Sequence, residues 1–144
     1  MKRSHGVTAG LIAVAFVAGV YVGGGVQAQA QRKPIRVLEV RKYTANDGKL
    51  DALVKRMREH EAGFFAKYGM TNVFHAVAAD APDSANTYLY VLGHESREAA
   101  TKEWADFRQD KEWPVFRAES EKDGTILKKA EVTFYNVTDY SAIK

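Results

Sequence analysis

The chain has 144 residues and carries 21 basic and 18 acidic side chains, which gives a formal net charge of +3. This length suits one compact domain. The near-neutral balance argues against a nucleic-acid partner, because dedicated nucleic-acid-binding proteins normally present a strongly basic face. The chain contains no cysteine, which excludes disulfides, thiolate nucleophiles, iron–sulfur clusters and cysteine-ligated zinc.

The first thirty residues differ in composition from the rest of the chain. Lys2 and Arg3 precede a largely apolar run over residues 7–26, and the run leads into Ala28-Gln29-Ala30. A basic start, an apolar centre and a small-residue exit are typical of a secretory signal peptide. We therefore expect residues 1–30 to be cleaved after Ala30 and the mature domain to be periplasmic or secreted. The alternative is an uncleaved anchor that tethers the domain to a membrane, since the run is long enough to span a bilayer.

The sequence after the leader predicts alternating strands and helices. Branched and apolar residues without a breaker predict a strand from Ile35 to Tyr43. Apolar side chains at helical spacing predict a helix from Leu50 to Tyr68, and Gly69 is expected to end it in a left-handed conformation. A second strand is predicted from Thr71 to Ala78.

The second half of the chain repeats this alternation. A third strand is predicted from Thr87 to Gly93, and Ser96 is expected to cap a second helix. Trp113 and Pro114 are expected to begin a short further helix, and the fourth strand lies within Ile126 to Thr138. The order β-α-β-β-α-β with right-handed crossovers is the ferredoxin-like α+β arrangement, in which helices cover one face of a four-stranded antiparallel sheet.

The other face of this sheet also needs a cover. In the first strand, the apolar pair Leu38 and Val40 is expected to pack on the helices, so Glu39, Arg41 and Tyr43 would point away from them. The matching outward set of the third strand is Tyr88, Tyr90, Leu92 and His94. An exposed aromatic face marks an interaction site, and a second copy related by a two-fold axis is its simplest cover. We therefore expect a homodimer that closes into an α/β barrel.

Glu61 lies in the middle of the apolar face of the first predicted helix, and His60 lies at the edge of that face. A buried lone carboxylate is costly, so Glu61 should be either paired or protonated. In one interpretation Glu61 accepts a hydrogen bond from a backbone group or from an arginine on a neighbouring strand, and so locks the helix to the sheet. In the other it lines a pocket and has a raised pKa.

Glu39, Arg41 and Tyr43 form a second group of candidate ligand-binding residues. They either make an intrastrand ion pair at the dimer seam or form a cluster in which Arg41 holds a ligand carboxylate or carbonyl. Tyr90 and His94 share the predicted face and complete the set. The histidines lack metal-ligand spacing, so we expect no metal and no cofactor, and the sequence identifies no catalytic residues.

Four segments, in this order and spacing, resemble the NIPSNAP family: VLEVRKYT (37–44), GKLDAL (48–53), REHEAGFFAKYGM (58–70) and EWADFRQDKEW (103–113). The resemblance covers roughly residues 37–129. It implies that residues 31–144 form a ferredoxin-like, dimeric α/β-barrel domain, and it implies no settled reaction, although the wider superfamily includes cofactor-independent monooxygenases and haem-degrading enzymes. The ending EVTFYNVTDYSAIK (131–144) is longer and more aromatic than the resemblance implies.

Two functional interpretations follow. The first is an exported barrel of undefined biochemical role that binds a small molecule or a partner protein. The second is a cofactor-independent monooxygenase or isomerase that takes a base or hydrogen-bond donors from Glu61, His60, Arg41 and Tyr43. A cavity of about a few hundred Å³ where Glu61, Arg41 and a histidine converge would favour the enzyme, whereas a solid interior would favour the first interpretation.

Overall fold

The computed structural model describes residues 33–143, so the predicted leader lies outside the described part of the chain. The strands are β1 (Val37–Ala45), β2 (Thr71–Val77), β3 (Thr87–His94) and β4 (Leu127–Asn136). The helical segments are α1 (Leu50–Arg56), the π-helix η1 (Met57–Glu61), α2 (Ala62–Lys67), the short 3-10 helix η2 (Asp83–Ala85), α3 (Arg97–Arg108) and α4 (Trp113–Ser120). No helix within residues 33–143 is long and apolar enough to cross a membrane.

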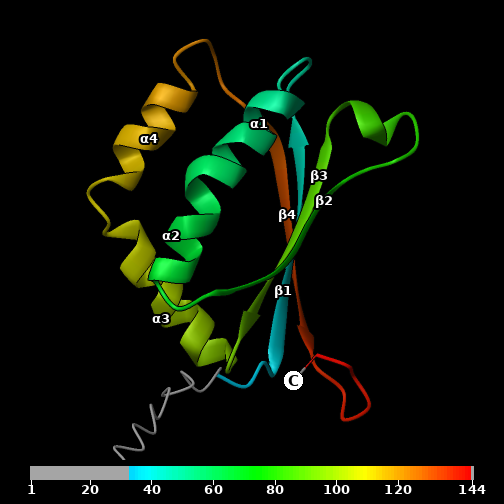
Figure 1. Ribbon diagram of the computed structural model, residues 1–144, viewed down its shortest axis with the longest axis vertical. Helices are drawn as coiled ribbons and strands as arrows, with labels where there is room; N and C mark the ends of the chain where they lie inside the picture. The colour runs from blue at the N-terminus through cyan, green and yellow to red at the C-terminus, as the bar shows by residue number, and fades with distance from the viewer. Residues whose placement is uncertain (1–32, 144) are drawn as a thin grey trace, which may run out of the picture. The chain divides into compact units, whose positions relative to one another are not determined.

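The four strands form one antiparallel sheet in the order β2-β3-β1-β4. The four α-helices all lie on one side of this sheet, and within residues 33–143 no α-helix covers the opposite face (Figure 1). This two-layer arrangement is the predicted ferredoxin-like α+β fold. β2 and β4 are its edge strands, so any site between the helices and β2 opens at one side of the domain.

The structure confirms two helix boundaries predicted from the sequence, the end of α2 at Gly69 and the start of α3 at Ser96. Gly69 follows α2 with φ +88°, the left-handed conformation that glycine adopts at low cost. The Ser96 hydroxyl accepts a hydrogen bond from the Ala99 backbone N–H at 3.1 Å, which caps α3. The predicted helix from Leu50 is one continuous helical segment, but its middle five residues form the π-helix η1 rather than α-helix.

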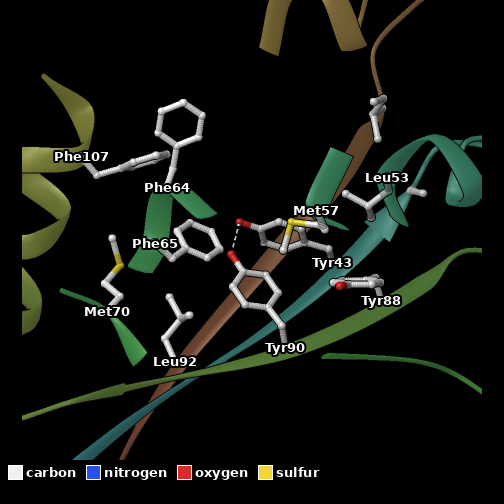
Figure 2. Close-up of a cluster of buried hydrophobic side chains, with 12 residues drawn as sticks. Tyr43, Leu53, Met57, Phe64, Phe65, Met70, Tyr88, Tyr90, Leu92 and Phe107 are labelled. Carbon is white, nitrogen blue, oxygen red and sulfur yellow. Dashed lines mark hydrogen bonds between the residues drawn. The ribbon is translucent and has the colours of Figure 1, made fainter. Parts of the chain in front are cut away.

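The core lies between the helices and the sheet and is rich in aromatic side chains (Figure 2). Phe65 of α2 stacks on Tyr90 of β3, with ring centroids 5.6 Å apart. Leu53 of α1 and Met57 of η1 are buried in the same cluster as Tyr90. Aromatic side chains bury large apolar areas, so this layer accounts for much of the domain's stability.

The predicted assignment of sheet faces was wrong. Glu39 and Tyr43 of β1 and Tyr90 of β3 are buried beneath the helices, whereas Leu38 and Val40 point to the helix-free face and are only half-buried. The remaining members of the third-strand set, Tyr88, Leu92 and His94, also lie beneath the helices. A mixed polar face can be buried here because its charged groups pair with one another and with α3, as described below.

The helix-free face carries apolar side chains together with Lys42 and Glu131. Val132 and Phe134 of β4 lie opposite Arg41 and Glu39 and so share the helix side. The opposite face presents apolar side chains from all four strands: Leu38, Val40, Phe74, Leu89, Val91 and Tyr135. Phe74 and Tyr135 are 46% and 52% exposed, respectively. We call this set the outer sheet face.

Candidate functional site

A fully buried carboxylate, Glu39, is the centre of a polar network between β1 and α3. Its Oε1 accepts from Arg41 Nε at 2.6 Å, and its Oε2 accepts from Trp104 Nε1 at 2.6 Å. His94 Nε2 lies 3.0 Å from the same Oε2. Burial would by itself raise the pKa of Glu39, but these donors more than offset it and the pKa is lowered below its usual value.

His94 bridges two carboxylates. Its Nε2 contacts Glu39, and its Nδ1 lies 2.6 Å from an oxygen of Glu103 on α3. Both ring nitrogens therefore face acceptors, which favours the doubly protonated imidazolium. Burial opposes the charge, but the two carboxylates prevail and the pKa of His94 is raised. The imidazolium thus ties the end of β3 to both β1 and α3.

Arg41 extends the network along β1. Its NH1 donates to the Tyr43 hydroxyl at 3.1 Å, and the Tyr90 hydroxyl donates to that oxygen at 2.8 Å. The Arg41 guanidinium also lies 4.0 Å from the ring centroid of Trp104, a cation–π contact.

Five of the seven predicted pocket residues meet in one cluster: Glu39, Arg41, Tyr43, Tyr90 and His94. Their polar groups contact one another or α3, so this cluster locks helix to sheet.

Glu61 is buried, as its place on the helix indicated, with 5% exposure. Its Oε2 lies 3.2 Å from Arg56 Nε, a charged contact that lacks the alignment of a hydrogen bond. Arg56 also donates to Glu121 at 3.1 Å. Burial raises the pKa of Glu61 although Arg56 opposes the rise. The expected arginine on a neighbouring strand is replaced by one on the same helical segment, across the π-turn of η1.

His60 lies apart from the cluster around Glu39, and it shares a recess with Arg56. Its ring stacks on Phe116 of α4 with centroids 4.4 Å apart. Both residues line a recess of about 310 Å³ between α1–η1 and α4, whose rim is charged. Glu61, Arg41 and a histidine therefore do not converge on one cavity.

A larger groove, of about 490 Å³, lies between the first helical segment and the β2 edge of the sheet. Its walls are mostly apolar and come from both layers: Val54, Met57, Ala62, Ala76 and Val77. Three polar side chains also line it, namely Arg58 of η1, His75 of β2 and Tyr88 of β3. A mainly apolar groove with a few polar groups is the common form of a small-molecule site.

Two of these polar side chains, His75 and Tyr88, form a hydrogen-bonded chain with Asn72, which we call the Asn72–His75–Tyr88 relay. Asn72 Nδ2 donates to the Ala62 carbonyl at 2.9 Å, and Asn72 Oδ1 lies 3.0 Å from His75 Nε2. His75 Nδ1 lies 3.0 Å from the Tyr88 hydroxyl. Burial lowers the pKa of His75 and raises the pKa of Tyr88 to about 12, an effect that Glu61 adds to and Arg58 opposes. Both side chains are therefore neutral near pH 7.

These three residues are not among the ligand-binding residues predicted from the sequence. Asn72 and His75 are three positions apart, so a regular strand would point them to opposite faces. The pairing of β2 with β3 shifts between Asn72 and Phe74, and this bulge puts both side chains on the helix side. No residue pattern in the chain signals a bulge at this position.

The network around His94 predicts a pH-dependent stability. The raised pKa of His94 means that its contribution is complete below its ordinary value of 6.5 and is lost as pH rises through the folded-state pKa. Glu39 has a lowered pKa, so its contribution is present above 4.5 and is lost as pH falls through its own folded-state value. The pair stabilises the fold most between these two ordinary values.

We therefore expect His94→Gln to reduce the free energy of unfolding by about 3 kcal/mol near pH 6, because it leaves Glu39 and Glu103 without their buried cation. Urea unfolding from about pH 6 to about pH 9 should show the difference between wild type and variant shrinking as pH rises. His60→Gln, outside the network, is the control for the loss of a histidine elsewhere in the domain. A His94→Gln difference that stays flat or grows with pH would contradict the assignment of an imidazolium.

Comparison with known proteins places this geometry in a family. The NIPSNAP family model matches residues 38–142. The match runs into the C-terminal tail, so the ending that seemed unusual falls within the family pattern. None of the curated proteins matches the chain significantly.

Solved structures of NIPSNAP proteins have the same fold at low sequence identity. A NIPSNAP family protein from Agrobacterium tumefaciens is 19% identical with a TM-score of 0.65, covering 75% of this chain and 98% of its own. A second protein from that organism, of unknown function, is 16% identical with a TM-score of 0.65, over 76% of this chain and 95% of its own. An uncharacterised NIPSNAP domain protein from Burkholderia xenovorans is 14% identical with a TM-score of 0.62, over 73% of this chain and 97% of its own. With the family model matching most of its length, the chain belongs to the NIPSNAP family.

Proposed function

We propose that this protein is an exported, homodimeric NIPSNAP barrel that binds a small, largely apolar molecule. The groove of about 490 Å³ between η1 and β2 carries this proposal. Its apolar walls supply the burial that drives binding of a small molecule, and its few polar groups can orient the ligand. Val77 at its rim is 51% exposed, so apolar surface remains for a ligand to cover.

Ligand binding is better supported than catalysis, because none of the residues predicted to act as a base or hydrogen-bond donor lines the groove. An enzyme needs a base or hydrogen-bond donors facing its substrate. Of the candidates for that role, Glu61, Arg41 and Tyr43 do not line the groove, and their polar groups contact other protein groups. His60 lines the separate recess beside α4. The monooxygenase or isomerase alternative would therefore have to use other residues.

The outer sheet face supports the homodimer. Phe74, Tyr135, Leu38 and Val40 present apolar surface that a monomer would leave in contact with water. A second copy offers the same surface, and two such sheets can pack face to face about a two-fold axis. The groove is on the helix side, so both copies would keep theirs open to solvent.

The leader supports export. Its basic start, apolar run and Ala28-Gln29-Ala30 exit fit a cleaved signal peptide, and we propose a periplasmic or secreted mature domain. An uncleaved anchor would present the same domain at a membrane surface.

Filling part of the groove should weaken binding of an apolar probe. We expect wild type to bind the neutral fluorescent dye N-phenyl-1-naphthylamine, and Val77→Trp to weaken this by at least about fivefold because the indole occupies the rim. Val115→Trp, at a 66% exposed position on α4, is the matched control and should bind like wild type. Fluorescence titration measures both. Absence of binding to wild type, or equal binding by all three proteins, would contradict a ligand site in the groove.

Charge on the outer sheet face should separate the dimer. Phe74→Asp introduces two carboxylates into the proposed interface, one from each copy, and we expect a monomer by light scattering at micromolar concentration. Phe74 is half-exposed in the single chain, so the fold should persist. Val115→Asp on α4 should leave the dimer intact. A monomeric wild type would refute the dimer and leave the groove proposal standing.

The signal peptide can be tested on the exported protein itself. Intact-mass spectrometry should give the mass of a chain that starts at Gln31, because the export peptidase cuts after the small-residue exit. A protein that retains Met1 would show an anchor instead.

A further inference from the structure

We propose that the groove selects a small organic acid that also carries a hydroxyl group, with Arg58 pairing with the acid and the Tyr88 oxygen accepting the hydroxyl hydrogen. This inference rests on the proposed ligand-binding function and names the chemical class of the ligand. It is carried by the direction of the hydrogen bonds in the Asn72–His75–Tyr88 relay and by the cation at the groove wall.

The relay begins at a fixed amide. Asn72 Nδ2 donates to the Ala62 carbonyl at 2.9 Å. The opposite orientation of the amide would set two carbonyl oxygens against each other, so Asn72 Oδ1 must face His75. A carbonyl oxygen only accepts, and His75 Nε2 must therefore carry a hydrogen.

The rest of the chain follows from this first hydrogen. With Nε2 protonated, the Nδ1 of a neutral His75 is an acceptor. Tyr88 has one hydroxyl hydrogen, and it is used in the 3.0 Å contact with Nδ1. The Tyr88 hydroxyl therefore has no second hydrogen to donate to a ligand, and its oxygen can only accept. Tyr88 therefore presents an acceptor to the groove, and it selects a ligand that brings its own donor.

Ring packing keeps this relay in place. The His75 ring stacks on Tyr90, with centroids 5.6 Å apart and planes within 5° of parallel. Tyr90 is itself fully buried and hydrogen-bonded to Tyr43. The acceptor is consequently preorganised before a ligand arrives, which lowers the entropic cost of reading a hydroxyl group.

Arg58 supplies the second recognition element. Its exposed side chain lines the same groove, and it takes no part in the ion pairs formed within residues 33–143. A guanidinium binds a carboxylate through paired N–H groups. Between it and Tyr88 the walls are apolar, as at Met57 and Val54. A ring system with an acid at one end and a hydroxyl at another matches this distribution of charge.

The test compares ligands that differ by one group. The probes are 6-hydroxy-2-naphthoate, its methyl ether 6-methoxy-2-naphthoate, and 2-naphthoate, titrated by fluorescence against the full mature protein. Wild type should bind the hydroxy acid about fivefold more tightly than the other two, as expected for one net hydrogen bond. The methyl ether keeps the oxygen and lacks the hydrogen, so this comparison needs no protein variant.

Two variants then assign the contacts. Tyr88→Phe should remove the preference for the hydroxy acid and cost the hydroxy acid more affinity than 2-naphthoate, because the acceptor for the ligand hydroxyl is lost together with the hydrogen bond to His75. Arg58→Gln should weaken all three acids by a similar factor, and by more than it weakens binding of the neutral N-phenyl-1-naphthylamine. Arg108→Gln, an exposed arginine of α3 away from the groove lining, is the charge-matched control and should change neither.

Each outcome separates this inference from the function on which it rests. Equal affinity of wild type for the three acids, or a hydroxyl preference that survives Tyr88→Phe, would overturn the inference. Binding of the neutral dye with no binding of any acid would also overturn it, while the groove would remain a ligand site. Failure of every probe to bind wild type would refute the proposed function itself.

Discussion

The burial of one carboxylate, Glu39, decides which way the sheet faces. An ionised carboxylate in an apolar layer is tolerated only when its oxygens are satisfied. Here Arg41 satisfies one oxygen, and Trp104 and His94 meet at the other. Two of these three groups come from the sheet and one from α3, so the pairing requires that this face of β1 lie against the helices. The rest of the layer order follows from that requirement.

A strand that turns its polar face inward must turn its apolar face outward. Leu38 and Val40 therefore join Phe74 and Tyr135 on the outer sheet face. The polar network and the apolar outer face are two consequences of the same alternation along β1. The inward network adds stability within one chain, whereas the outer face gains its stabilisation only when something covers it. This asymmetry is the physical basis for the proposed pairing of two copies.

The sequence was sufficient to predict the helices and strands, and insufficient to predict which face of the sheet lies against the helices. Gly69 and Ser96 have local conformational preferences, and both ended or began helices as predicted. Glu61 was correctly placed on a buried helix face, because helical periodicity fixes that geometry. The faces of β1 were reversed, because alternation shows that two sets exist and not which one finds partners. Glu39 is paired with Trp104 and His94, which lie more than fifty residues away in the chain. The hydropathy pattern of β1 does not indicate such distant partners.

Tyr90 connects the stabilising network to the groove. Its hydroxyl donates to Tyr43, whose oxygen also accepts from Arg41, and its ring supports His75 on the groove side. The ring plane of His75 is thus set by a residue that the Glu39 network holds in place. A loose His75 could rotate and offer Tyr88 either a donor or an acceptor, and the groove would then lose its discrimination between ligands. The buried network, which itself lines no groove, is therefore the reason that the groove can have a defined hydrogen-bonding polarity.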